Sequence, residues 1–342
     1  MINGKLRPWG KPGWLLGMPT LQNKEWMLIG SVATQDRCLG MLRHRGTSYR
    51  LGHAAFLEII DEDSQFTART TRRRGANRLL WETEAPVASR ELHSFALFDP
   101  IKKLKNLVDT WTNHRYAENI ILDTSTLPER FLFPMIRWLL ESPNVRNLVF
   151  TYMLPERYTH EDLAYNAREA AHLPTFLNDS TTAEGHIKHV IVGVGFMSFS
   201  LPEWLKKTYL NPKVKVSLLF PFPSKPANVK KGWEFVRRVE HNVNLADDRQ
   251  IARVDAHDLS ACYDRIRSIT SNGKSPAVFA PFGPKAHSVA MCLQAINMGA
   301  EVFYTHPSYY HPDYSTGLRL EDGLPYGYAY AARLNGNDLY SG

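Results

Sequence analysis

The chain contains few cysteines and no long apolar run. Cys38, Cys262 and Cys292 are odd in number and far apart in the sequence, which favours reduced thiols in a cytoplasm over a disulfide framework or a metal cluster. No stretch approaches the roughly 20 apolar residues that a membrane-spanning helix needs. The segment from Met1 to Gly17 has no apolar core followed by a small-residue cleavage site, so no signal peptide is predicted. We therefore expect a cytoplasmic protein without a membrane partner.

The common catalytic signatures are absent as well. The sequence has no Gly-x-Ser-x-Gly elbow, no His-Glu-x-x-His helix, no Cys-x-x-Cys pair and no Walker spacing. Asp255 to Asp258, and His306 with His311 and Asp313, combine metal-ligand residue types without a zinc spacing. No convergent acid-base set is legible. We predict no metal site and no catalytic residue, the cofactor is unknown, and the sequence leaves enzyme activity undecided while favouring a binding role.

The positive charge is modest but unevenly spread. A net charge of +7 and a pI near 9.2 over 342 residues are compatible with a nucleic-acid partner and equally with a mildly basic soluble protein. Five arginines fall within ten residues that contain no acid, namely Arg69, Arg72, Arg73, Arg74 and Arg78. The segment shows no apolar period, so we expect a loop. It would bind phosphates of a nucleic acid, or else be solvated or bind an acidic partner protein.

Short apolar strands alternate with amphipathic helices along most of the chain. Strands are expected in the first half near residues 26–32, 54–60, 95–98, 120–122 and 147–152, and in the second near 189–194, 214–220, 251–254, 278–280 and 301–304. Residues 101–114 are typical of a helix, with apolar residues three and four apart. Residues 161–171 are predicted to be helical too. This alternation indicates parallel βαβ units.

The same order of elements occurs twice. Corresponding strand residues are separated by 162 positions for Ile29 and Ile191, and by 154 for Phe150 and Tyr304. The sequence therefore predicts an α/β protein with two tandem, internally duplicated Rossmann-like halves and mostly parallel sheets. Short runs that are apolar throughout, such as 190–194, suit strands covered on both faces. Whether the halves share one sheet stays open.

The predicted domains follow from this repeat and from the composition. We expect an irregular N-terminal arm at residues 1–25, a Rossmann-like half at 26–172, a polar linker at 173–187, a second half at 188–315 and a Tyr/Gly-rich tail at 316–342. Because this tail is rich in aromatic residues, we expect it to pack on the body of the protein or on a partner.

Ligands of such sheets bind beyond the carboxyl ends of the strands. This rule selects candidate ligand-binding residues from both halves: Asp123, Thr124, Ser125, Gly193, Gly195, Asp255, Gly283 and Lys285. In the second half, Gly283-Pro284-Lys285 joins a strand to a helix. Its glycine allows close backbone approach, and the helix start with Lys285 would attract an anion, although the turn is equally explained as a plain helix start. Gly193-Val194-Gly195 lacks the third glycine of the dinucleotide fingerprint.

Asp123-Thr124-Ser125 occupies the equivalent position in the first half. Its hydroxyl groups and carboxylate would bind a ribose or a phosphate. The alternative is a helix cap, because Thr126 is followed three residues later by Glu129, the spacing of a capping box.

These paired turns resemble those of Rossmann-like sensor domains of the CARF type, which belong to bacterial antiviral systems and bind cyclic oligonucleotides at such turns. The family pattern has Asp or Asn, Ser or Thr two residues later, and Lys or Arg four beyond that. Asp123 and Ser125 match it, but position 129 is Glu and the nearest arginine is Arg130. The resemblance implies a sensor or complex subunit of a bacterial defence-type system that binds a nucleotide or nucleic acid.

Two other functions stay open. One is an enzyme acting on a nucleotide or phosphorylated metabolite, with Lys285, Asp123 and Asp255 in its cleft. The other is a structural adaptor whose arginine segment and aromatic tail contact a protein partner. In either case we expect a protein partner or a homo-oligomer.

Overall fold

The computed structural model describes residues 6–85, 89–159, 161–177, 187–208, 214–223, 226–242 and 250–341. Residues 1–5 of the predicted arm and 178–186 of the predicted linker lie outside this range. The chain divides into two compact units, one formed by Met1–Asn166 with Ser308–Leu339 and the other by Ala167–Pro307 with Tyr340–Gly342. In the described residues, no helix is both long enough and apolar enough to cross a membrane.

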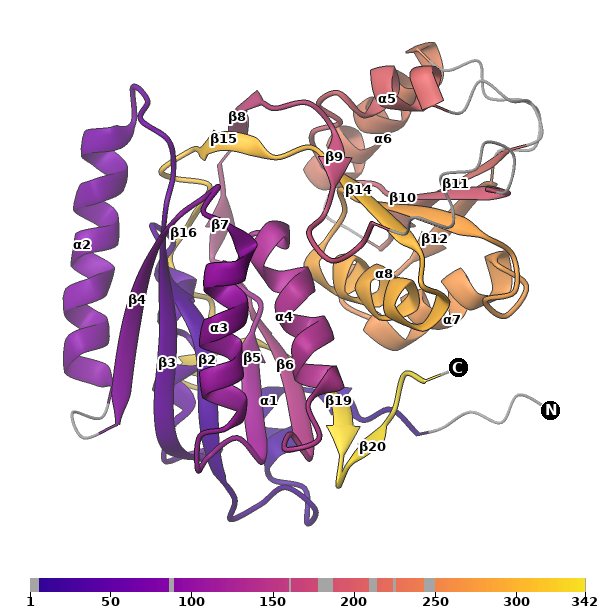
Figure 1. Ribbon diagram of the computed structural model, residues 1–342. Helices are drawn as coiled ribbons and strands as arrows, with labels where there is room; N and C mark the ends of the chain where they lie inside the picture. The colour runs from indigo at the N-terminus through magenta and orange to yellow at the C-terminus, as the bar shows by residue number, and fades with distance from the viewer. Residues whose placement is uncertain are drawn as a thin grey trace. The chain divides into compact units, whose positions relative to one another are not determined.

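The first unit is built on a sheet with the strand order β1-β19-β6-β5-β2-β3-β4 (Figure 1). Its five central strands are β2 (Glu25–Val32), β3 (Arg50–Ile60), β4 (Arg90–Ala96), β5 (Asn119–Asp123) and β6 (Asn147–Met153). They all run parallel. The helices between them are η1 (Asp36–Leu39), η2 (Leu42–His44), α2 (Thr67–Glu84), α3 (Ile101–Thr112) and α4 (Glu129–Glu141), with α3 and α4 side by side on one face.

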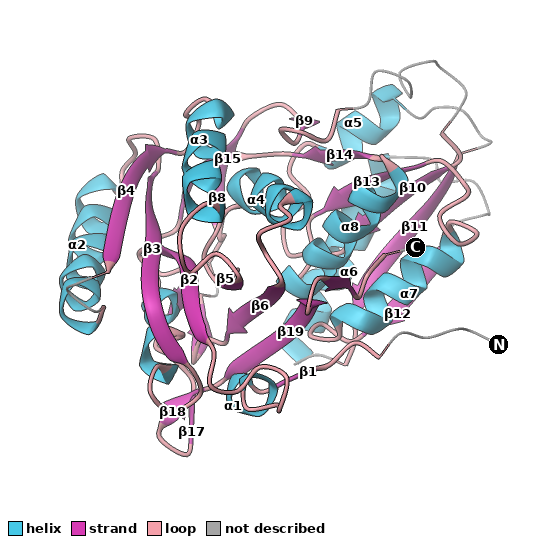
Figure 2. Cartoon of the chain, turned by 60° about the horizontal axis from the view of Figure 1, so that its bottom comes forward, coloured by secondary structure: helices cyan, strands magenta, loops and turns pink. Residues whose placement is uncertain are grey.

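The two ends of the chain complete this sheet. Strand β19 (Gly327–Leu334) lies antiparallel to β6, and β1 (Trp9–Gly10) lies antiparallel to β19 (Figure 2). The ring of Trp9 stacks on Tyr330 at 5.9 Å between centroids, so the aromatic tail packs on the body of the protein. Smaller elements of these segments are α1 (Pro12–Leu16), β7 (Arg157–Tyr158), β16 (Ser315–Thr316), β17 (Leu320–Glu321), β18 (Leu324–Pro325) and β20 (Asn337–Asp338).

The second unit repeats the arrangement. Its sheet has the order β12-β11-β10-β13-β14-β9. The strands are β9 (Ala171–His172), β10 (His189–Gly193), β11 (Lys215–Pro221), β12 (Gln250–Val254), β13 (Ala277–Pro281) and β14 (Glu301–Tyr304). All but β9 are parallel. The helices are α5 (Leu201–Thr208), α6 (Pro226–Asn242), α7 (Leu259–Ile269) and α8 (Lys285–Met298).

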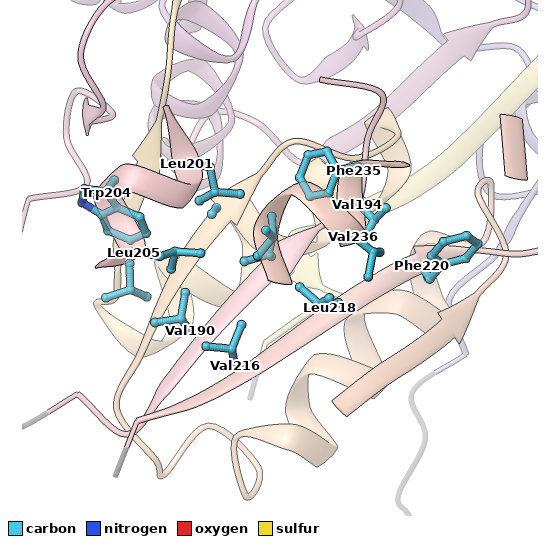
Figure 3. Packing of buried hydrophobic residues seen from close by; sticks show 14 residues of the cluster. Val190, Val194, Leu201, Trp204, Leu205, Val216, Leu218, Phe220, Phe235 and Val236 are labelled. Atoms are coloured by element: carbon cyan, nitrogen blue, oxygen red, sulfur yellow. The ribbon is translucent and has the colours of Figure 1, made fainter. Parts of the chain in front are cut away.

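One face of this second sheet carries a continuous apolar core (Figure 3). Alternate strand residues such as Val190, Val216 and Leu218 point to it and meet α5 and α6 through residues such as Leu205 and Phe235. Each is buried, which is the burial expected of strands covered by helices.

The parallel α/β fold predicted from the sequence is confirmed. Numbered in chain order, the parallel strands of both sheets run 3-2-1-4-5, an order typical of Rossmann-like folds. Each residue pair used for the sequence offsets falls in or just after corresponding strands. The internal duplication itself, as a history of the chain, stays a prediction.

Two local predictions are wrong. The helix expected at residues 161–171 is replaced by β8 (Ala164–Ala167) and β9, and β8 pairs with β15 (Pro307–Tyr310). Tyr165 stacks on Tyr309 at 5.5 Å, so a partner distant in sequence decides the conformation. The arginine segment is a helix, α2, rather than a loop.

Candidate functional site

In each sheet the strand order reverses between the first strand and the fourth. That reversal leaves a crevice at the carboxyl ends, where ligands of such folds bind. In the first unit it lies between β2 and β5, and in the second between β10 and β13. Six of the eight predicted ligand-binding residues lie at or just after the ends of the strands that flank these two reversals. The other two are Asp255, which follows β12, and Lys285, which begins α8.

The turn of the first unit is closed by its own side chains. Asp123, Thr124 and Ser125 are buried. The Ser125 hydroxyl donates to the Asp123 carboxylate and accepts from the backbone N–H of Met153 at 2.8 Å. The Thr124 hydroxyl donates to the carbonyl of Thr151 at 2.8 Å. These groups tie β5 to β6, so the polar atoms predicted to bind a ligand bind the protein itself.

The predicted capping box is wrong. Helix α4 begins at Glu129 with Pro128 as its N-cap residue, and no side chain caps it. The Thr126 hydroxyl instead bonds the Ser31 hydroxyl at 2.7 Å. Ser31 is the penultimate residue of β2, so this bond joins the two sides of the crevice.

Sequence reasoning missed a buried arginine next to this turn. Arg37, in η1, donates to the Tyr152 hydroxyl at 2.9 Å and lies over the rings of Tyr152 and Tyr158. Burial works against its charge, but the phenols of Tyr152, Tyr158 and Tyr314 outweigh burial and raise the pKa of the guanidinium. The partners of Arg37 come from segments distant in sequence. The only sequence signal for this cluster of Arg37 and tyrosines was the presence of aromatic residues after β6 and in the tail.

The turn of the second unit is made of backbone. A Cβ added to Gly193 would lie 3.0 Å from the backbone nitrogen of Gly283, and one added to Gly195 would lie 1.8 Å from the carbonyl oxygen of Phe282. The three predicted glycines therefore come together, and they allow the segments after β10 and β13 to touch. In the first unit, the side chains of Asp123, Thr124 and Ser125 occupy the equivalent position.

Helix α8 begins directly at this turn. Pro284 is its N-cap residue, so the first helical turn, with the positive end of the helix dipole, starts at Lys285. The His287 Nε2–H donates to the carbonyl of Asp255 at 2.9 Å. Burial lowers the pKa of His287 to about 4, so the ring is neutral. Through this bond Asp255, after β12, is connected to the α8 turn.

Two buried polar atoms of this helical turn lack partners within the part of the chain that the structure describes. They are the Nδ1 of His287 and the Oγ of Ser288. Buried polar atoms are nearly always hydrogen-bonded, so these two, in side chains that are completely buried, are exceptions to that rule. The nearby Asp258 has a structural role instead, since its carboxylate caps α7 by accepting from Ala261 N–H at 2.7 Å.

Four of the five clustered arginines are engaged by acids. Arg69 and Arg73 both bind Asp313, while Arg74 and Arg78 each lie 3.6 Å from Glu58. Arg73 also lies 3.6 Å from Asp36, and Arg78 lies 3.3 Å from Glu82 on the same helix. Most of these acids are outside the ten-residue segment and its helix, which is why a charged loop was expected. Among the described residues only Arg72 of the five makes no ion pair. Nucleic-acid binding by this segment stays a prediction, with less free charge than the sequence suggested.

The pair of Arg74 and Glu58 gives a testable consequence. Both side chains are about nine-tenths buried, at 9% and 10% exposed, and Arg78 and Ser94 also reach Glu58. We expect Arg74→Ala to lower the free energy of unfolding by about 2 kcal/mol, because it leaves a buried carboxylate less compensated. Urea unfolding measures this free energy. Arg72→Ala, on the same helix, is the matched control and is expected to change the free energy of unfolding by less than about 0.5 kcal/mol. An equal loss of stability in both variants would contradict the role of the pair.

Comparisons with known proteins show similarity of structure only. No family model matches the chain, and no curated protein does. A type III CRISPR defence DNA nuclease activated by cyclic oligoadenylate is similar at 8% identity and a TM-score of 0.48, over 82% of this chain and 65% of the nuclease. A putative universal stress protein from Pseudomonas aeruginosa is similar at 11% identity and a TM-score of 0.26, over 83% of this chain and 94% of that one.

The likeness to the nuclease agrees with the loose resemblance drawn from the sequence. The chain spans 65% of the length of the nuclease. With TM-scores below 0.5 the two likenesses carry no argument about ligand, partner or reaction.

Proposed function

We propose that the chain is a non-catalytic binding protein, a sensor or complex subunit of a bacterial defence-type system, whose second unit binds a nucleotide at the turn between β10 and α8. The defence-type part of the proposal comes from the sequence resemblance. The binding site comes from the turn itself.

The observation that carries this proposal is the contrast between the two equivalent turns. Asp123, Thr124 and Ser125 use their polar atoms on one another and on strand β6. The turn of the second unit has glycine backbone where those side chains would be, followed by a helix N-terminus. A phosphate accepts hydrogen bonds from backbone N–H groups at such a position and is attracted by the positive end of the helix.

Lys285 is the residue we assign to the ligand charge. It is the first residue of α8 and is half-buried. An ammonium group at a helix N-terminus is disfavoured by the helix dipole, and a bound phosphate would offset that cost while gaining a charge-assisted bond. Gly193, Gly195 and Gly283 then have the role of letting the segments after β10 and β13 touch, which fixes the start of α8 beside them, and Asp255 that of holding His287 in place.

The test is calorimetric titration of the full chain with a panel of ATP, cyclic AMP and a cyclic oligoadenylate. We expect one of them to bind, and Lys285→Ala to weaken that binding about tenfold or more, the equivalent of one charge-assisted hydrogen bond. Lys285→Arg is expected to restore part of the affinity, since it keeps the charge.

Lys274→Ala is the matched control. Lys274 is exposed in the turn that precedes β13, at the opposite end of the same strand from Gly283. It is expected to leave binding unchanged. Failure of every nucleotide in the panel to bind, or the same loss from both alanine variants, would overturn the proposed site.

A further inference from the structure

The outer edge of the second sheet forms a cavity. Its volume is about 470 Å³, and it is lined by Trp233 of α6, by Ile251, Ala252 and Arg253 of β12, and by Arg265 of α7. Strand β11 lies between β12 and the strands of the proposed nucleotide site. The cavity is therefore separate from that site, and a ligand in it would not depend on a nucleotide bound at the α8 turn.

The cavity lies over the edge of β12 rather than over one of its faces. Side chains of successive strand residues point to opposite faces, yet the three consecutive residues 251, 252 and 253 all line it. Within the described residues β12 pairs with β11 alone, in the register Leu218 to Ile251 and Phe220 to Arg253. The other side of β12 has no strand partner among the described residues, and an added strand would pair with backbone N–H and C=O groups on that side.

The walls of the cavity are positive and aromatic. Arg253 is exposed and Arg265 is half-buried, and neither makes an ion pair in the described part of the chain. The guanidinium of Arg253 lies 5.5 Å from the ring centre of Phe222, and Trp233 packs against Phe220 at 5.0 Å. The aromatic contacts hold the arginine and the indole in place, so the charge is already positioned for a ligand.

We propose that β12 is a docking edge for an extended, acidic segment of a partner protein, which adds to the sheet as a further strand. Its backbone pairs with the free edge of β12, and its carboxylate side chains bind Arg253 and Arg265, one from each side of the edge. An apolar side chain of the segment packs on Trp233 and Ile251. The complementary charge selects an acidic segment over a basic one, and the exposed backbone selects an extended segment over a helix.

A small anion with an aromatic ring is the competing occupant, because the cavity is also large enough for a nucleotide. The two differ in what they need. A strand needs the backbone edge of β12, whereas a small anion needs only the arginines and the indole. The experiment therefore has to separate backbone pairing from side-chain contacts.

The test is selection of random peptides of about eight residues, the length of an ordinary strand, on the full chain. We expect the enriched peptides to carry Asp or Glu on both faces of the strand, at positions an odd number of residues apart. The control variant Lys274→Glu, which reverses an exposed charge at a distance from β12, is expected to enrich the same peptides as the natural protein. The double variant Arg253→Glu with Arg265→Glu is expected not to enrich them. The milder double variant, with Gln at both positions, guards against misfolding and is checked by its thermal unfolding.

One enriched peptide is then synthesised with N-methyl groups on alternate backbone nitrogens. Methylation of the nitrogens that face β12 removes the pairing N–H groups, so we expect the affinity to fall about tenfold or more, whereas methylation of the other set should have little effect. Equal affinity of both methylated forms, peptides without acids, or equal enrichment on the arginine variants would overturn the proposal. Displacement of the peptide by ATP, with no dependence on methylation, would assign the cavity to a small anion instead.

Discussion

Gly195→Ala is expected to destabilise the second unit by at least about 3 kcal/mol. The added Cβ would lie 1.8 Å from the carbonyl oxygen of Phe282, far inside contact distance. The added Cβ is fixed to the backbone of Gly195, and the oxygen that it meets is a backbone atom of Phe282. Neither can move aside as the end of a flexible side chain would. The turn would have to open, separating the segments after β10 and β13 that form the proposed nucleotide site.

Hydrogen exchange followed on peptides from each unit measures this effect, because the two units need not unfold together. Peptides of β10 and β13 should exchange faster in the variant, and those of β2 and β5 should not. Gly75→Ala is the control. No atom lies within 4 Å of a Cβ at Gly75, inside α2, so the same substitution should stabilise the first unit by about 0.5–1 kcal/mol. Unchanged exchange in β10 and β13 would refute the close-contact explanation.

Most of the central strands were predictable because each is a short apolar run, whereas the mostly polar strand β4 (Arg90–Ala96) was expected only at residues 95–98. Strands such as β10 and β13 are buried over nearly their whole length, and a fully covered strand leaves that record in its own residues. Segments whose conformation depends on distant partners left no such record. The arginines of helix α2 pair mostly with acids outside the helix, namely Asp36, Glu58 and Asp313, and β8 has its aromatic partner at Tyr309.

The candidate site also has a part that was predictable from the sequence and a part that was not. Gly193, Gly195 and Gly283 were selected by their place after strands, and the sheet order brings them together. The sequence did not distinguish a turn whose side chains bond the neighbouring strand from a turn whose contacts are made by glycine backbone. That difference rests on bonds such as Ser125 to Met153, which join residues 28 positions apart, and local spacing carries no information about them.

Asp123→Asn is expected to make the protein more stable at neutral pH. Burial raises the pKa of Asp123 from 3.8 to about 6, although Ser125 and Arg37 act against burial. The folded state thus binds this proton more tightly than the unfolded chain does. The free energy of unfolding falls as the pH rises from about 4 to about 6. The stability lost by ionising the buried Asp123 carboxyl is not regained at higher pH. A shift of about two units corresponds to about 3 kcal/mol. Asn removes the charge and keeps an oxygen that accepts from Ser125.

Urea unfolding at several pH values checks this sign. The variant should exceed the natural protein by up to about 3 kcal/mol above pH 7, and the difference should disappear only below about pH 3, where the Asp123 carboxyl is protonated in both the folded state and the unfolded chain. Binding of the nucleotide identified for the Lys285 site should be unchanged, because the turn of the first unit is occupied by its own side chains. A variant that is less stable at pH 8, or that loses the nucleotide, would mean that the charge of Asp123 is kept for a ligand and that the closed turn opens to receive it.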